Sequence, residues 1–146
     1  MEKSLEGLIA AQQALRDRFE DFRRALGPRD EEAYRVALTD LHACLRRWTE
    51  GEEQALLPAL GRTTIHGRDA QRELRLECVQ VRELTRYLLS QVEERAPISD
   101  ILGLTENLDR RLAAHESELR EVYFPAAATV LTTEEWRILD EACAPL

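Results

Sequence analysis

Apolar side chains recur at helical spacing in four long stretches of the chain. Within each stretch they are separated by steps of three and four residues, which places them on one face of an amphipathic helix. The stripe of the first stretch consists of Leu5, Leu8, Leu15, Phe19, Phe22 and Leu26. Glycine and proline separate the stretches from one another. The pattern predicts four helices, over about 4–26, 31–57, 69–94 and 99–125.

The predicted helices are long and the connections between them are short. About 25 residues per helix correspond to roughly 37 Å at 1.5 Å per residue. Short connections between long amphipathic helices favour antiparallel packing. We therefore expect an all-α fold, an antiparallel up-down-up-down four-helix bundle, in one domain spanning residues 1–146. The run Thr132–Glu135 resembles a capping box and predicts a short C-terminal helix over about 132–143, packed over one end of the bundle.

The two halves of the chain resemble each other. When Gln12 is aligned with Cys78, the apolar residues around them also coincide, and nearly the same shift places Pro58 on Pro125. Generic helical periodicity does not produce the matched prolines. The sequence therefore predicts two helix-pair repeats that pack face to face with pseudo-two-fold symmetry. The repeats extend over about 4–60 and 69–127.

Four side chains of ligand or polar type interrupt the apolar stripes, one in each predicted helix. They are Gln12, Glu52, Cys78 and His115. In an antiparallel bundle all four lie roughly 8–14 Å from the same end, and therefore at one level. An isolated buried carboxylate costs several kcal/mol, so Glu52 needs a partner, for which His115 is the obvious candidate.

This polar layer has two interpretations. In the first, a hydrogen-bonded polar layer pairs Glu52 with His115, Gln12 lies beside them, and Cys78 packs as a small apolar residue. In the second, a metal ion binds an oxygen of Glu52, the sulfur of Cys78 and a nitrogen of His115, with Gln12 or water as the fourth group. Buried polar groups are usually satisfied by each other, which favours the first interpretation, but the second stays open.

The charge balance and the cysteine count bear on partners and compartment. The chain carries 20 basic and 28 acidic residues, for a formal charge of −8, whereas nucleic acids and anionic membranes attract a clustered positive face. We therefore expect no nucleic-acid partner. We also expect no membrane association, because no apolar run reaches the roughly 18–20 residues of a membrane span. Three cysteines without a CxxC spacing indicate free thiols in a reducing cytoplasm.

At the polar layer the chain resembles the hemerythrin-like family, also called the HHE cation-binding domain. The resemblance is clearest in two segments, Glu52–Leu60 and His115–Pro125, and extends through both helix pairs. These segments are similar to the family's stretch of a His, a Glu four residues later and a hydrophobic-Pro ending. The resemblance implies a four-helix bundle that, in complete members, holds a non-heme di-iron centre. Such centres bind dioxygen, sense redox or oxygen state, or store iron.

Most of the iron ligands that this resemblance implies are replaced. The family has a His where this chain has Gln12, Trp48 and Cys78. It has a carboxylate where this chain has Leu119. Tryptophan and leucine offer a metal no lone pair, so we do not expect an intact di-iron centre.

The leading functional hypothesis is a non-catalytic, cytoplasmic binding or sensory module whose di-iron site is largely lost. One alternative is a protein that binds a single metal ion, zinc or iron, through Glu52, Cys78 and His115; the thiolate shifts the preference towards zinc. Another alternative is a structural protein that forms a homodimer or binds a protein partner. The sequence predicts no catalytic residues and no organic cofactor.

Overall fold

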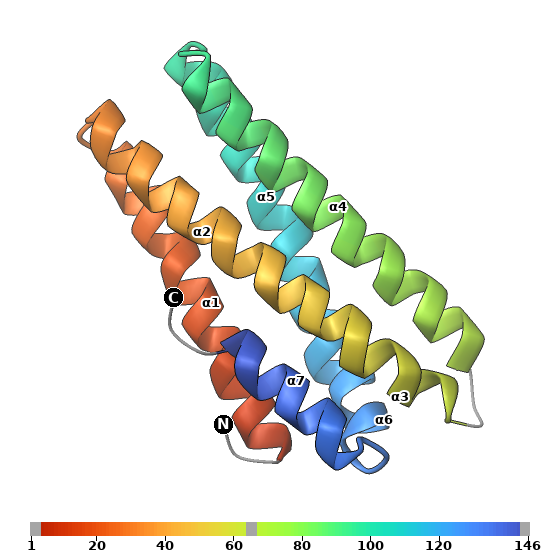
Figure 1. Cartoon of the computed structure of the whole chain (residues 1–146). Helices are drawn as coiled ribbons and strands as arrows, with labels where there is room; N and C mark the ends of the chain where they lie inside the picture. Colours follow the sequence, from red (N-terminus) through yellow and green to blue (C-terminus); the bar gives the residue numbers. More distant parts are fainter. Residues whose placement is uncertain (1–3, 64–66, 144–146) are drawn as a thin grey trace.

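The computed structural model describes residues 4–63 and 67–143, and all its regular elements within these ranges are helical. The long helices are α1 (Leu5–Leu26), α2 (Glu31–Gly51), α4 (Gly67–Glu93) and α5 (Ile98–Glu118). The short elements are η1 (Glu52–Leu56), α3 (Leu57–Gly61), η2 (Leu119–Tyr123), α6 (Phe124–Ala128) and α7 (Thr133–Cys143). Figure 1 shows the four long helices side by side, with α7 against the end of α2. The predicted all-α class is confirmed.

Each half of the chain contains one turn of π-helix at the same relative position. In η1 the N–H of Leu57 donates to the carbonyl oxygen of Glu52, and the N–H of Phe124 makes the equivalent bond in η2. Each turn ends two residues before one of the matched prolines, Pro58 and Pro125. The sequence predicts that the helices end near these prolines, but the chain stays helical through α3 and α6. A proline has no N–H and its ring crowds the carbonyl one turn back, and the wider turn accommodates both defects.

The short C-terminal helix begins with the predicted capping box. The hydroxyl oxygen of Thr132 accepts the N–H of Glu135 at 3.1 Å, and the Glu135 carboxylate accepts the N–H of Thr132 at 2.9 Å. Arg62 also donates to Glu135, at 2.9 Å, and so ties α7 to the residue that follows α3. Helix α7 also packs closely on α2. A Cβ added to Gly51 would lie only 2.6 Å from the Cβ of Ala142, so this close approach requires glycine at position 51.

Contacts between consecutive long helices join α1 to α2, α2 to α4 and α4 to α5. Arg16 connects α1 to α5, because it donates to Asp109 at 2.7 Å and to the Glu116 carboxylate at 2.9 Å. Its guanidinium and that of Arg23 each lie 5.0 Å from the ring centroid of Phe19. The four long helices therefore surround one interior.

The buried apolar side chains form two clusters along this interior. The cluster nearer the α1–α2 connection includes Phe19, Phe22, Leu38, Leu41, Leu88 and Leu108. The cluster nearer α7 includes Leu8, Leu56, Leu74, Cys78, Leu119, Tyr123 and Phe124. Within residues 4–63 and 67–143, no helix is both long enough and apolar enough to cross a membrane.

Candidate metal centre

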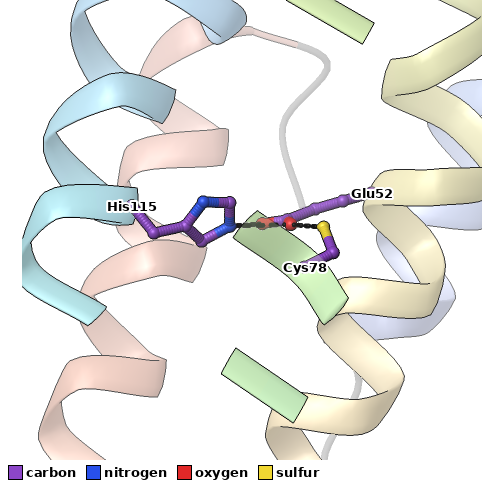
Figure 2. A group of neighbouring side chains, drawn as sticks. All are labelled: Glu52, Cys78 and His115. Carbon is purple, nitrogen blue, oxygen red and sulfur yellow. Dashed lines mark hydrogen bonds and ion pairs between the residues drawn. The ribbon is translucent and has the colours of Figure 1, made fainter. Parts of the chain in front are cut away.

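Three of the four side chains of the predicted polar layer meet inside the fold. Glu52 belongs to η1, Cys78 to α4 and His115 to the last turns of α5, and Figure 2 shows them directed toward one another. A carboxylate oxygen, the sulfur and a ring nitrogen lie within 4.8 Å of one another. The exposed fractions of the three residues are 0%, 0% and 3%, so all three are buried.

The carboxylate of Glu52 lies between the other two side chains. Its Oε2 accepts a hydrogen bond from the Cys78 thiol at 2.9 Å. Its two oxygens lie 3.1 and 2.9 Å from Nε2 of His115. Because the π turn η1 begins at Glu52, the wider turn lies where the carboxylate leaves the backbone. This agrees with the frequent occurrence of π turns at functional sites.

Glu77 adds a second carboxylate to the group, and the apolar and polar pattern of the sequence does not single it out. Its Oε1 lies 2.8 Å from Nδ1 of His115, and its Oε2 accepts a hydrogen bond from the Tyr123 hydroxyl at 2.6 Å. The side chain of Glu77 is 23% exposed, whereas Tyr123 is fully buried. A continuous chain of hydrogen bonds therefore runs from Tyr123 through Glu77, His115 and Glu52 to Cys78.

The charges of the two carboxylates decide the protonation of His115. Burial by itself lowers the pKa of this imidazole, but the charges and hydrogen bonds of Glu52 and Glu77 prevail and raise the pKa to about 10. Burial, followed by the charge of Glu52, raises the pKa of the Cys78 thiol above its ordinary value. At neutral pH, without a metal, the Glu52–His115 pair therefore keeps its shared proton, and the Cys78 thiol stays neutral.

The group could hold one metal ion, because it presents nitrogen, sulfur and oxygen ligand atoms from three helices at one point. A metal ligand needs a free lone pair, so an ion must displace the proton on Nε2 of His115 and the proton of the Cys78 thiol. A bound ion would supply, beside Glu52, the positive charge that the displaced proton supplies in the metal-free group.

Gln12, the fourth member of the predicted layer, is buried but has a different partner. Its side-chain nitrogen donates to the backbone carbonyl of Glu116 at 2.8 Å, next to His115 in the chain. Its role as a fourth metal ligand stays a prediction. Trp48 and Leu119, at two further positions where the family resemblance implies ligands, are buried among apolar side chains.

A cavity of about 280 Å³ between α4 and α5 approaches the group from one side. Both Glu77 and His115 lie in its lining, and so do the acidic residues Glu73 and Glu118 and the basic residue Arg111. The cavity therefore meets the hydrogen-bonded chain at Glu77, on the Nδ1 side of the imidazole.

The other cysteines and His42 lie elsewhere. Cys44 and Cys143 line a separate cavity of about 190 Å³, where burial raises the pKa of both thiols. His42 lies on α2, and burial lowers its pKa. In the part of the chain that the structure describes, none of these three residues belongs to a cluster of candidate metal ligands.

Comparison of the chain with protein-family models, curated proteins and solved structures returned no match. The hemerythrin-like resemblance therefore stays a prediction that rests on the residues that carry it. Function is accordingly inferred from the geometry of the Glu52, Cys78 and His115 group.

Proposed function

We propose that this chain is a small metal-binding module that holds one divalent ion, zinc or ferrous iron, between Glu52, Cys78 and His115. The observation that carries the proposal is the position of the three ligand atoms within 4.8 Å of one another in a buried interior. From the sequence alone, this function ranked behind a metal-free module. The convergence of an imidazole, a thiol and a carboxylate from three helices makes it the better supported one.

Zinc fits this ligand set best. Zinc binds imidazole nitrogen and carboxylate oxygen at about 2.0–2.2 Å and thiolate sulfur at about 2.3 Å, so the ligand atoms of a tetrahedral site lie roughly 3.3–3.8 Å apart. The hydrogen-bonded atoms of the group are 2.9 to 3.1 Å apart. All three ligand atoms lie within 4.8 Å of one another, so adjustments of the side chains would bring them to these spacings around an ion. A thiolate ligand also favours zinc over magnesium, calcium or manganese.

Three protein ligands leave one position of a tetrahedral zinc ion for water or another small ligand. That arrangement differs from the closed four-ligand sites of purely structural zinc ions. It suits a module that exchanges or senses an ion. The proposal is limited to binding of the ion and assigns no reaction to the chain.

The proposal includes a hemerythrin-like architecture, an antiparallel up-down-up-down four-helix bundle built from two helix pairs. The π turns η1 and η2, at matched positions in the two halves, support it. The di-iron centre of complete family members does not fit this interior. Trp48 and Leu119 lack suitable donor atoms, and Gln12 is directed to a backbone carbonyl. The remaining ligand types suffice for one ion.

A second candidate is the metal-free binding or sensory module. It is favoured by the observation that Glu52, His115 and Cys78 already satisfy one another by hydrogen bonds. In that case the layer fixes the packing of the helices, and the function lies elsewhere on the molecule. Metal titration separates the two candidates.

The test is the stoichiometry and affinity of zinc and ferrous iron, measured by competition with a chromophoric chelator in reducing buffer. The wild-type protein should bind one ion per chain, and Cys78→Ser and His115→Ala should each abolish or strongly weaken binding. Cys44→Ser and His42→Ala are matched controls, because these residues lie outside the group, and they should bind like the wild type. Equal affinity in all five proteins, or binding of two irons per chain, would reject the proposal.

A further inference from the structure

Glu77 connects His115 of the candidate metal group to the buried side chain of Tyr123. One of its oxygens lies 2.8 Å from Nδ1 of His115, and the other accepts the hydroxyl of Tyr123 at 2.6 Å. Glu77 also lines the cavity between α4 and α5. Both oxygens of this carboxylate are therefore engaged, although the side chain borders an open cavity.

We propose that Glu77, held in place by Tyr123, is a positioning residue of the metal site. Its role is to fix the ring orientation and the tautomer of His115. This inference rests on the proposed metal-binding function. A carboxylate that accepts the Nδ1 hydrogen leaves Nε2 as the nitrogen that faces Glu52 and the ion, and it makes that nitrogen a better donor to the metal.

Tyr123 keeps the Glu77 carboxylate in the orientation that contacts His115. A glutamate on the wall of an open cavity can otherwise rotate its carboxylate into solvent, which would release the imidazole. The Tyr123 hydroxyl blocks that rotation, because it holds the second oxygen of Glu77 from a fully buried position. Tyr123 is the last residue of the π turn η2. The π turn of the second half thus contributes to the site through Tyr123, whereas that of the first half contributes the ligand Glu52.

The chain offers a matched control for Glu77. Glu73 lies one helical turn earlier on α4 and lines the same cavity. It brings the same charge to the same surface but, among the described residues, has no hydrogen bond to His115. A general electrostatic attraction of the cavity for cations would involve both glutamates, whereas a positioning role belongs to Glu77 alone.

The experiment measures the dissociation constant for Zn²⁺ in the full-length chain by chelator competition. Glu77→Gln should weaken zinc binding by about 10–100-fold, the usual effect of losing such an outer carboxylate. Tyr123→Phe should weaken it by a smaller factor, and it should cause no further loss when added to Glu77→Gln, since it acts through Glu77. Glu73→Gln should leave the constant unchanged.

Substitution of Co²⁺ for zinc gives a readout that a purely structural role would not change. Saturated Glu77→Gln protein should keep the sulfur-to-cobalt absorption band, because Cys78 still binds the ion, while its visible ligand-field bands shift as the imidazole changes. An unchanged Zn²⁺ constant in Glu77→Gln, or an equal loss in Glu73→Gln, would overturn the inference while leaving the metal site intact. Absence of zinc binding by the wild type would instead reject the proposed function, and the inference with it.

Circular dichroism of the metal-free variants tests whether they fold. Tyr123→Phe removes one oxygen and keeps the buried ring, so it tests the inference even if Glu77→Gln destabilises the protein. A folded Tyr123→Phe variant with wild-type zinc affinity would overturn the proposed part of Tyr123.

Discussion

The metal-free protein should lose stability steadily as the pH rises from 7.5 to 9.5, because the Glu52–His115 pair keeps a proton in the folded state. The pKa of His115 is about 10 in the folded chain, against an ordinary value of 6.5. A raised pKa means that the stabilisation is complete below about pH 6.5. It is lost as the pH rises through the folded value, and little of it remains above pH 10.

The size of the effect follows from the number of protons. Between pH 7.5 and 9.5 the folded pair holds one proton that the unfolded chain has released. Linkage then lowers the free energy of unfolding by about 1.4 kcal/mol per pH unit, or roughly 3 kcal/mol over this range. The slope does not depend on which partner carries the proton, since the pair titrates as a unit.

Urea denaturation in the presence of a chelator and a reductant measures this slope. The reference is the double variant Glu52→Gln/His115→Gln. The double substitution removes both members of the pair, so that neither a buried imidazole nor a buried carboxylate is left without its partner. Titrating groups that do not contact the pair contribute equally to both proteins, and burial, the largest cause of the raised pKa of Cys78, is present in both. Parallel curves for the wild type and the double variant would refute the buried, proton-sharing pair.

Three further predictions concern packing, metal and capping. Gly51→Ala should destabilise the protein by about 1–3 kcal/mol, because the new Cβ would lie 2.6 Å from a side-chain carbon of α7. Gly103→Ala, whose new Cβ would have no neighbouring atom within 4 Å, should instead stabilise the protein by about 0.5–1 kcal/mol. Equal urea midpoints for the two variants would contradict the packing of α7 on α2. Zinc at a thousandfold excess over its dissociation constant should add about 4 kcal/mol to the free energy of unfolding of the wild type and, at the same zinc concentration, much less to that of Cys78→Ser. A similar gain in both proteins would place the ion elsewhere. Thr132→Ala should cost about 1 kcal/mol through loss of the cap of α7, and Thr133→Ala much less; identical melting temperatures would argue against the capping box.

The members of the candidate site could be found from the sequence because each one interrupts an apolar stripe. Glu52, Cys78 and His115 occupy core positions of three helices, and the geometry of antiparallel helices places such positions at one level. The structure brings these three together. Gln12 satisfied the same criterion, but the sequence could not show that its amide would reach the backbone carbonyl of Glu116.

Glu77 could not be found in this way. It precedes Cys78 directly, at the edge of the stripe, where a charged residue is normally solvated. Its importance depends on the space between α4 and α5 and on the position of Tyr123, and both are properties of the packed molecule. The sequence contained one signal: an acidic residue beside a buried cysteine on a helix that faces a histidine.

The π turns could not be predicted from the sequence either. Pro58 and Pro125 mark an irregularity in the sequence, but a proline is compatible with a helix end or with a widened turn. Packing decides between them. Ala59, Leu60 and Ala127, which follow the two prolines, are buried in the cluster nearer α7. Their burial favours continued helix over an exposed loop.

X-ray absorption spectroscopy at the zinc edge tests the central claim, a single ion bound by Glu52, Cys78 and His115, most directly. The zinc-loaded wild-type protein should show one sulfur neighbour at about 2.3 Å and the remaining neighbours, nitrogen or oxygen, at about 2.0–2.2 Å, with the outer-shell pattern of one imidazole. The sulfur neighbour should disappear in Cys78→Ser protein loaded at saturating zinc. A zinc ion without sulfur in the wild type, or with two sulfurs, would contradict the account.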